Sequence, residues 1–416
     1  MSPGSQPTPE AAAPTSSAKD HIALTEQTGA HNYAPLEVVL CRGEGAFVWD
    51  TDGQRYLDML SAYSAINQGH CHPRLVEAMQ RQAAQLALTS RAFYNDKLGP
   101  MQRALTEVTG METVLPMNSG AEAVETAIKA MRRYGYEKLN IPENQAQIIV
   151  AEGNFHGRTI SVVSFSTDAD SYGGYGPFTP GFITLPYGDL ASVERTLRDN
   201  PNVVGILVEP IQGEAGVVLP PENYLPGLRE LCDSYERVLC LDEIQTGLGR
   251  TGRMFCFEHA GIHPDLLILG KALSGGMYPI SAVAGPRRIM DVFTPGSHGS
   301  TFGGAPLAAA IATEALAVLR DEKLPERAAE LGEHMLARLT REITNEKVKE
   351  IRGKGLLIAV EFHTPIAKQA VKALHERYLL AKDTHQTTIR FAPPLVIDRA
   401  DLDHGIDIIV DVVNAA

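Results

Sequence analysis

The chain has 416 residues, of which 44% are hydrophobic and 21% charged, a composition typical of a soluble globular protein long enough for about two domains. Its formal net charge of −13 argues against nucleic acid and anionic membrane surfaces as partners, although local positive charge in a site can still bind an acidic substrate. No stretch approaches the roughly 18 apolar residues that a membrane-spanning helix needs, so no membrane partner is expected.

The N-terminal residues 1–20 are rich in Ser, Pro, Ala and Thr and contain one basic residue, Lys19. They lack the apolar core of a secretory signal and the arginines of a transit peptide, so we predict a disordered tail. The five cysteines follow no regular spacing. They indicate reduced thiols and a cytoplasmic protein rather than a disulfide framework.

The first predicted element is a β-hairpin over 45–58, with its turn at Asp52-Gly53. From about residue 72, short apolar runs alternate with stretches of helical spacing. The helical stretches include 74–88, 96–108, 190–198 and 223–236, and the apolar runs are 113–117, 147–151, 182–186, 203–208, 238–241, 265–269 and 280–284. This alternation predicts an α/β fold with a mostly parallel sheet that is covered on both faces.

After about residue 306 the pattern changes to long amphipathic stretches with few strand candidates. The helical stretches are 307–320, 323–344, 366–380 and 399–412, and the strand candidates lie near 346–362 and 388–391. This part is predicted to be a second, α+β domain, with boundaries near 70 and 306–312.

Two residues at the ends of apolar runs carry the strongest chemical indication. Lys271 follows the run Leu266–Leu269, and Asp242 ends the run Leu239–Leu241. Desolvation at such a position lowers the pKa of a lysine, which suits imine formation and proton transfer. A buried aspartate must be paired, either with a structural arginine or with a protonated ring nitrogen. Together the two residues predict a pyridoxal 5'-phosphate (PLP) enzyme, with Lys271 as the Schiff-base lysine and Asp242 on the pyridinium nitrogen.

Two loops after strand-like runs each have a functional and a structural interpretation. The segment Asn118–Ala121 either binds a phosphate at a helix N-terminus or is an ordinary N-cap, and phosphate binding is preferred beside a PLP lysine. In the loop 153–159, Phe155 either covers a flat cofactor ring or belongs to the core, and Arg158 either binds a carboxylate or is a surface charge.

Three further segments are equally open. Glu209 and Glu214 are either site carboxylates or turn residues. The glycine-rich loop 298–304 either binds phosphate or simply turns. Arg390 lies within an apolar run and needs an anion, which is either a protein carboxylate or a substrate.

In combination, these motifs strongly resemble the class III (subgroup II) PLP-dependent aminotransferases over roughly residues 23–416. The segments that carry the resemblance are Gly29–Tyr33, Tyr63–His70, Leu88–Asn95, Glu209–Gly216 and Asp242–Gly247. The resemblance implies PLP-dependent transferase fold type I, in which a large domain with a mostly parallel seven-stranded sheet is joined to a smaller α+β domain. It implies four regions, which are the tail 1–20, an N-terminal segment 21–70 that packs with the small domain, the large domain 71–311 and the small domain 312–416.

The resemblance also implies roles in cofactor binding. Lys271 carries the cofactor and shifts the proton, and Asp242 holds the pyridinium proton. Gln245 hydrogen-bonds the phenolic oxygen, and Phe155 stacks on the ring. The phosphate is bound by Ser119, Gly120 and Ala121, together with Ser300 and Thr301 of the neighbouring subunit. A homodimer or a higher homo-oligomer is therefore the expected active form.

For the substrates, the resemblance implies transfer of the δ-amino group of L-ornithine to 2-oxoglutarate, which gives glutamate and glutamate 5-semialdehyde (pyrroline-5-carboxylate after cyclisation). Arg158 is expected to bind the distal carboxylate and Arg390 the proximal one, with Glu214 pairing with Arg390 when ornithine is bound. Tyr33 and Tyr63 are expected to line the ornithine end of the site.

Three other functions stay open at this point. The first is a sibling aminotransferase that uses N-acetylornithine, 4-aminobutyrate or lysine as donor. The second is a PLP aminomutase or decarboxylase, against which Arg390 argues because such enzymes need no separate 2-oxoglutarate site. The third is a binding protein on a degenerate enzyme scaffold, which ranks lowest because every expected catalytic residue is present.

Overall fold

A computed structural model describes residues 17–416. The tail predicted over 1–20 falls mostly on residues 1–16, which lie outside the described residues. Helix α1 (Ala18–Thr28) begins inside that tail, because Ser17 and Asp20 form a capping box at its N-terminus. The prediction of disorder is therefore wrong for residues 18–20.

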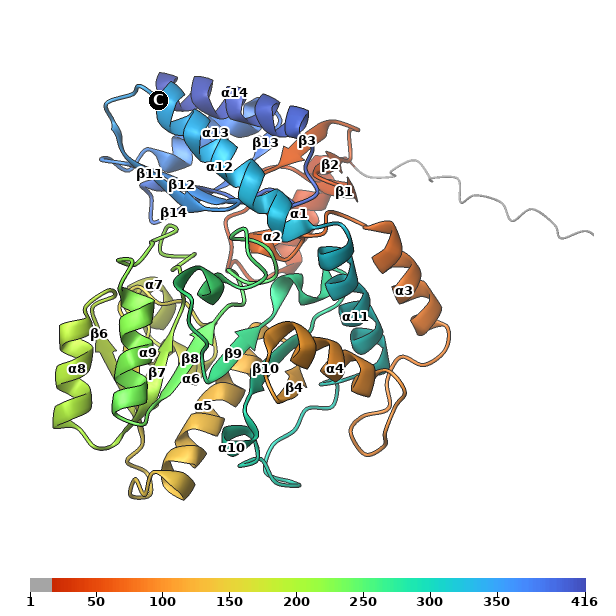
Figure 1. The fold of residues 1–416 in the computed structure, drawn as a ribbon. Coiled ribbons are helices and arrows are strands. Elements are labelled where there is room, and N and C mark those ends of the chain that lie inside the picture. The colour runs from red at the N-terminus through yellow and green to blue at the C-terminus, as the bar shows by residue number, and fades with distance from the viewer. Residues whose placement is uncertain (1–16) are drawn as a thin grey trace, which may run out of the picture.

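The larger group of elements is built on a seven-stranded sheet of order β4-β10-β9-β8-β7-β5-β6 (Figure 1). All its neighbouring strands are parallel except β10, which is antiparallel to both β4 and β9. The strands are β4 (Thr113–Met117), β5 (Gln147–Ala151), β6 (Phe182–Leu185), β7 (Val203–Val208), β8 (Val238–Asp242), β9 (Leu266–Leu269) and β10 (Ser281–Gly285). The predicted mostly parallel, seven-stranded sheet of fold type I is confirmed, and each of the seven apolar runs forms one of its strands.

These strands are apolar throughout because helices bury both faces of the sheet. Ile149 and Ile206 belong to one core cluster, whereas their chain neighbours Ile148 and Leu207 belong to a second one on the other face. The first face is covered by α4 (Leu98–Thr109), α8 (Leu190–Asp199), α9 (Tyr224–Ser234) and α11 (Pro306–Asp321), with α3 (Pro73–Ala83) against α11. The second face is covered by α5 (Gly120–Lys138), α6 (Ile160–Val163) and α10 (Arg287–Met290).

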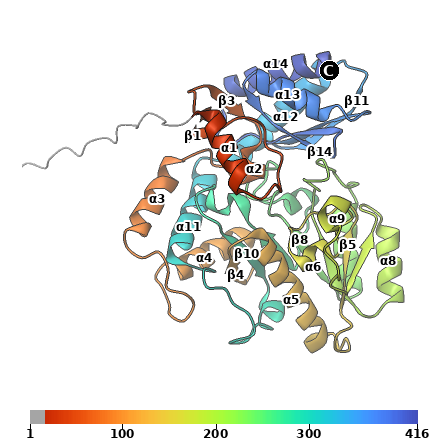
Figure 2. The same cartoon turned by 180° about the vertical axis from the view of Figure 1, so that it is seen from behind.

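The smaller group combines both ends of the chain, as the red and blue elements in Figures 1 and 2 show. It contains two four-stranded sheets, one of order β11-β12-β15-β14 and one of order β1-β2-β3-β13. The strands are β1 (Leu40–Glu44), β2 (Phe47–Asp50), β3 (Arg55–Asp58), β11 (Val348–Lys354), β12 (Leu357–Phe362), β13 (Leu379–Leu380), β14 (Lys382–Thr384) and β15 (Thr388–Phe391). The helices are α12 (Leu324–Glu342), α13 (Ala367–Glu376) and α14 (Arg399–Ala415).

Most local predictions are confirmed, and two helices are wrong at their ends. The helix expected over 74–88 ends at Ala83. The hairpin expected over 45–58 is β2 and β3. The helix expected over 366–380 stops at Glu376, because Tyr378 has a φ of 62° and the next two residues pair with β3. The domain boundaries stay a prediction, and α11 runs through the one expected at 311/312. Within residues 17–416, each helix is too short or too polar to span a bilayer.

Three short helices and two 3-10 turns lie in the loops between these elements. They are α2 (Ser61–Ser64), α7 (Ala169–Tyr172), η1 (Cys256–Ala260) and η2 (Lys271–Ser274), together with α6 described above. Two of them, α2 and η2, bear directly on the site described next.

Candidate active site

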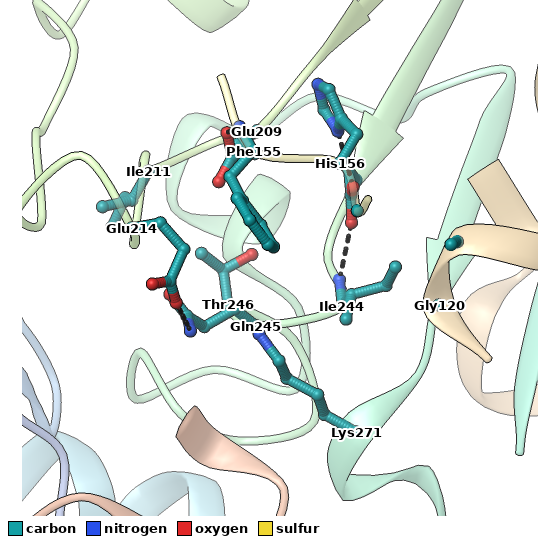
Figure 3. Close-up of a pocket in the computed structure, with 13 residues that line it drawn as sticks. Gly120, Phe155, His156, Glu209, Ile211, Glu214, Ile244, Gln245, Thr246 and Lys271 are labelled. Carbon is teal, nitrogen blue, oxygen red and sulfur yellow. Dashed lines mark hydrogen bonds and ion pairs between the residues drawn. The ribbon is translucent and has the colours of Figure 1, made fainter. Parts of the chain in front are cut away.

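A cavity of about 220 Å³ opens at the carboxyl ends of β5, β7, β8 and β9. This edge of an open α/β sheet is where such folds bind ligands. Figure 3 shows Phe155, Glu214 and Lys271 extending into the same space. The lining residues are Gly120, Ala121, Phe155, His156, Gly157, Glu209, Ile211, Glu214, Asp242, Ile244, Gln245, Thr246 and Lys271.

Lys271 lies where the buried strand β9 ends, at the start of η2. Its φ of 44° is left-handed, a conformation that costs a non-glycine residue about 1–2 kcal/mol. Such strain is typical of functional positions that the surrounding fold holds in place. Burial lowers the pKa of Lys271, although the carboxylates of Glu214 and Asp242 oppose that effect. A lysine in this state can form an imine and exchange protons near neutral pH.

Asp242 ends strand β8 and is fixed on both carboxylate oxygens. Its Oδ1 accepts a hydrogen bond of 3.0 Å from Ile244 N, and its Oδ2 lies 2.7 Å from His156 Nδ1. Burial alone lowers the pKa of His156, but the hydrogen bond and the charge of Asp242 outweigh burial and raise it. Asp242 and His156 therefore form a buried, hydrogen-bonded pair. His156 Nε2 has no hydrogen-bond partner within the described part of the chain.

Glu209 follows strand β7 and is a second buried carboxylate of the cavity. Its Oε2 accepts a hydrogen bond of 2.9 Å from Phe155 N, so it fixes the backbone that carries the aromatic ring. Burial raises the pKa of Glu209 to about 7, against the attraction of His156. The sequence left this residue open between a site carboxylate and a cap, and the structure places it in the cavity wall.

The raised pKa of Glu209 gives a pH-dependent stability. Between its unfolded value of 4.5 and the folded value of about 7, the native state binds more protons, so this residue costs stability as the pH rises. We expect Glu209→Gln to unfold at the same temperature as the wild type near pH 4.5 and to be more stable by up to about 3 kcal/mol at pH 8. Thermal unfolding at both pH values measures the difference, and a stability gain independent of pH would contradict it.

A charged cluster links the cavity residues Glu214 and Gln245 to Arg390 of the smaller group of elements. Arg390, on β15, is only 2% exposed, and its Nη1 lies 2.8 Å from Glu214 Oε1 and 3.1 Å from Gly213 O. Gln245 Nε2 donates to the same Glu214 oxygen at 3.2 Å. Burial raises the pKa of Glu214, but Arg390 and Lys271 outweigh burial and lower it. The arginine therefore has its anion, and that anion is a side chain on a loop of the other group of elements.

The tyrosines expected at the substrate end lie beside this cluster. The guanidinium of Arg390 lies 5.2 Å from the centre of the Tyr63 ring. Tyr33 is 78% exposed and acts electrostatically on Tyr63, so the two phenols are neighbours. Neither tyrosine lines the cavity itself.

The start of α5 forms the opposite wall. Ser119 caps the helix, with its Oγ accepting from Glu122 N and the Glu122 carboxylate accepting from Ser119 N. The N-cap interpretation is therefore confirmed. Gly120 and Ala121, at the start of this 19-residue helix, line the cavity, and phosphate binding there stays a prediction. A Cβ added to Gly157 would lie 2.9 Å from Ala121 Cβ, so the glycine keeps this wall open for an anion.

Arg158, Ser300 and Thr301 likewise do not line the cavity in the single chain. Arg158 is exposed and stacks over Phe155 at 5.6 Å. Ser300 Oγ accepts hydrogen bonds from Asn118 Nδ2 at 2.8 Å and Gly303 N at 3.1 Å, and Thr301 is exposed. Their expected roles stay predictions.

Sequence reasoning gave no role to His156. The residue follows Phe155 in the loop after β5, and its contact with Asp242 joins residues 86 positions apart. A histidine beside a predicted ring-stacking aromatic was the only available signal, and it did not identify the partner.

Comparisons with known proteins agree on one family. The family model described as aminotransferase class III matches residues 28–413. A protein of Brevibacillus brevis named ornithine aminotransferase is 53% identical over 94% of this chain and 98% of its own length. The crystal structure of the ornithine aminotransferase from Toxoplasma gondii has a TM-score of 0.94 and 47% identity, and covers 96% of each chain. That of an acetylornithine aminotransferase from Elizabethkingia anophelis has a TM-score of 0.89 and 49% identity, and covers 97% of this chain and all of its own.

Proposed function

The chain belongs to the class III aminotransferases, and from that premise we propose that it is an L-ornithine:2-oxoglutarate 5-aminotransferase with PLP as its cofactor. Its products are glutamate and glutamate 5-semialdehyde, which cyclises to pyrroline-5-carboxylate. The observation that carries the proposal is the ion pair of Arg390 and Glu214 beside Lys271. When the pair separates, Arg390 can bind the carboxylate of glutamate. When ornithine is bound, the pair stays together and Arg390 is not available to a substrate carboxylate.

The cavity residues fit PLP by their chemistry. The N-terminus of α5, kept open by Gly157, suits the phosphate, and Phe155 suits the flat ring. Asp242 suits a protonated ring nitrogen, and Gln245 suits the phenolic oxygen. When bound, PLP supplies an electron sink for the charge left when a proton is removed from the carbon that bears the amino group.

The protein residues supply binding and proton transfer. Lys271 Nζ, whose pKa burial lowers, accepts that proton and returns it. The Asp242 carboxylate would stabilise a proton on the ring nitrogen, and His156 holds that carboxylate in place. The burial of Asp242 and Lys271 strengthens the electrostatic interactions of these groups.

The two amino donors make opposite demands on Arg390. Ornithine reacts at its δ-amine, so its carboxylate lies far from the reacting carbon, and Glu214 stays paired with Arg390. Glutamate reacts at its α-amine, so Arg390 binds the neighbouring carboxylate and Glu214 moves away, while Arg158 takes the distal carboxylate. Leaving Arg390 unpaired would be costly because it is buried. Tyr33 and Tyr63 line the ornithine end.

Removing the masking carboxylate should change the preference between donors. In Glu214→Ala, Arg390 is always free to bind a carboxylate next to the reacting amine, so the ratio of glutamate to ornithine rates should rise by about 10-fold or more. Single-turnover rates of the first half-reaction with each donor measure this ratio. The exposed Glu222→Ala is the control, and an unchanged ratio in Glu214→Ala would reject the masking role.

The deciding experiment is a visible absorption spectrum of the purified holoenzyme. We expect L-ornithine alone to remove the band of the lysine-bound cofactor, and 2-oxoglutarate to restore it. A band that ornithine leaves unchanged contradicts ornithine as donor. No band after PLP addition contradicts the enzyme function itself.

The second candidate is an N-acetylornithine aminotransferase, because one similar structure carries that name at 49% identity. The acetyl group removes the positive charge of the α-amine, so a site built for ornithine discriminates against it. The ratio of kcat/KM for the two donors decides between these functions.

We propose a cytoplasmic homodimer as the minimal active form. Thr301 and the neighbouring Phe302 are exposed and do not line the cavity of their own chain, and Phe93 and Tyr94 are 72% and 102% exposed. Exposed aromatics of this kind are typical of an interface. The five cysteines are all unpaired, which agrees with a reducing compartment.

A further inference from the structure

The helix α2 (Ser61–Ser64) is a single left-handed turn. Its four residues have φ values of 50°, 46°, 60° and 72°, and none of them is glycine. The turn is closed by hydrogen bonds from Ala65 N and Ile66 N to Ser61 O. Chirality disfavours this conformation, which persists only where the surroundings impose it. The buried hydroxyls of Ser61 and Ser64 have no partner among residues 17–416, so these side chains do not hold the turn.

The groups that hold the turn are Asp58 and His70. Asp58 Oδ1 accepts hydrogen bonds from Leu60 N at 2.8 Å and Ser61 N at 2.9 Å, and so fixes the entry to the turn. Asp58 Oδ2 lies 2.7 Å from His70 Nε2, and the aspartate is only 7% exposed. All these contacts are on one buried carboxylate.

His70 is itself fixed by the small sheet. Its backbone N and O both bond to Gly45, at 2.8 and 3.1 Å. A Cβ added to Gly43 would lie 2.8 Å from the His70 ring, so glycine at that position leaves room for the imidazole. His70 and Gly45 therefore position the Asp58 carboxylate, and neither of these two residues lines the cavity.

The turn contacts the charged cluster in two ways. The ring of Tyr63 lies over the Arg390 guanidinium, 5.2 Å from its centre. The backbone O of Tyr63 accepts a hydrogen bond of 3.3 Å from Gln245 Nε2, the same nitrogen that donates to Glu214. A shift of the turn would therefore move both the ring that covers Arg390 and the amide that holds its partner.

We propose that Asp58 and His70 are positioning residues that act through Tyr63 on the carboxylate site at Arg390. By holding the left-handed turn, they set how tightly Arg390 binds a substrate carboxylate and how well ornithine is held. Neither residue lines the cavity, so they affect binding more than the chemical step. The part that concerns ornithine rests on the proposed function, whereas the part that concerns carboxylate binding does not.

The test is a double-mutant cycle on the holoenzyme. We expect Asp58→Asn to raise the KM for ornithine by about 10-fold and to change kcat by less than about 3-fold, since no group at the reacting atoms is altered. In a Tyr63→Ala background, Asp58→Asn should raise the KM for ornithine by less than about 2-fold, because the residue through which Asp58 acts is gone. Equal effects in both backgrounds, or a fall in kcat alone, would overturn the proposal.

Two further variants separate positioning from general stability. His70→Gln keeps a donor for Asp58 and should stay near the wild type, whereas His70→Ala should raise the KM as Asp58→Asn does. Ala62→Gly makes the left-handed conformation favourable. The double variant should therefore have a KM for ornithine at least about 3-fold lower than that of Asp58→Asn alone. No recovery, or an equal loss in both His70 variants, would argue for a purely structural role.

The chain provides a matched control in Asp50. Its Oδ1 also accepts two backbone hydrogen bonds, from Asp52 N and Gln54 N, and its Oδ2 also accepts from a side chain, Tyr56 OH. It lies in the β2–β3 turn, where it has no contact with Tyr63. We expect Asp50→Asn to leave the KM unchanged, and a 10-fold rise there would show that the effect is not specific to the turn.

A binding measurement tests the proposal without turnover. Glutarate is an unreactive dicarboxylate, and its Kd for the holoenzyme by calorimetry reports the carboxylate site directly. We expect Asp58→Asn to weaken glutarate binding by about 10-fold, again only when Tyr63 is present. If the wild type does not use ornithine, the proposed donor is wrong and the glutarate cycle still decides the positioning role. An unchanged glutarate Kd would refute it.

Discussion

Lys271→Ala is expected to lower kcat by at least about 10⁴-fold, because it removes the group that binds the cofactor covalently and moves the proton. The residue lies at a strained position whose φ is 44°, and burial lowers its pKa. Alanine at this position removes no hydrogen bond that fixes the surrounding loops, so folding should be retained. Steady-state turnover, the visible spectrum and thermal unfolding together measure these effects.

The control for this variant is Lys372→Ala, which removes an exposed lysine of α13 far from the cavity. It should keep both the turnover and the absorption band of the wild type. Multiple turnovers by Lys271→Ala at more than about one hundredth of the wild-type rate would contradict the catalytic role of this lysine.

Asp242→Asn is expected to lower kcat by about 10²–10³-fold. An amide cannot keep a ring nitrogen protonated, because it carries no negative charge. The substitution also removes the carboxylate that raises the pKa of His156, so burial should then lower that pKa. The pH dependence of kcat and the NMR titration of His156 would report both effects. An unchanged kcat would contradict the role assigned to Asp242.

The matched control is Asp265→Asn. Asp265 is likewise buried, accepts a hydrogen bond from Leu239 N at 2.9 Å and pairs with Arg229, but it precedes β9 at the opposite edge of the sheet. We expect it to lose stability by roughly 3–5 kcal/mol, as the breaking of a buried pair does. Its kcat should be preserved in the folded fraction. A comparable loss of kcat would show that the effect of Asp242→Asn is not specific to the cavity.

The local sequence pattern was enough to predict the seven-stranded sheet and to place Lys271 and Asp242 at its edge. Because helices cover both faces of a parallel sheet, its strands are short apolar runs that the sequence shows directly. The residue after such a run lies at the edge of the sheet where ligands bind, so Lys271 and Asp242 could be placed beside a cavity. The errors fell on short elements, such as the pairing of β13 with β3, which a two-residue strand does not reveal.

The sequence by itself therefore determined the α/β fold, the class of cofactor and the lysine and aspartate that line the cavity. Only the tertiary structure decided that His156 holds Asp242 and that Glu214 meets Arg390, contacts between residues 86 and 176 positions apart. It alone decided that residues 61–64 adopt a left-handed turn, since nothing in Ser-Ala-Tyr-Ser favours one. The physical reason is that periodicity records how deeply each residue is buried, whereas the register of the strands and the packing of loops decide which buried groups meet.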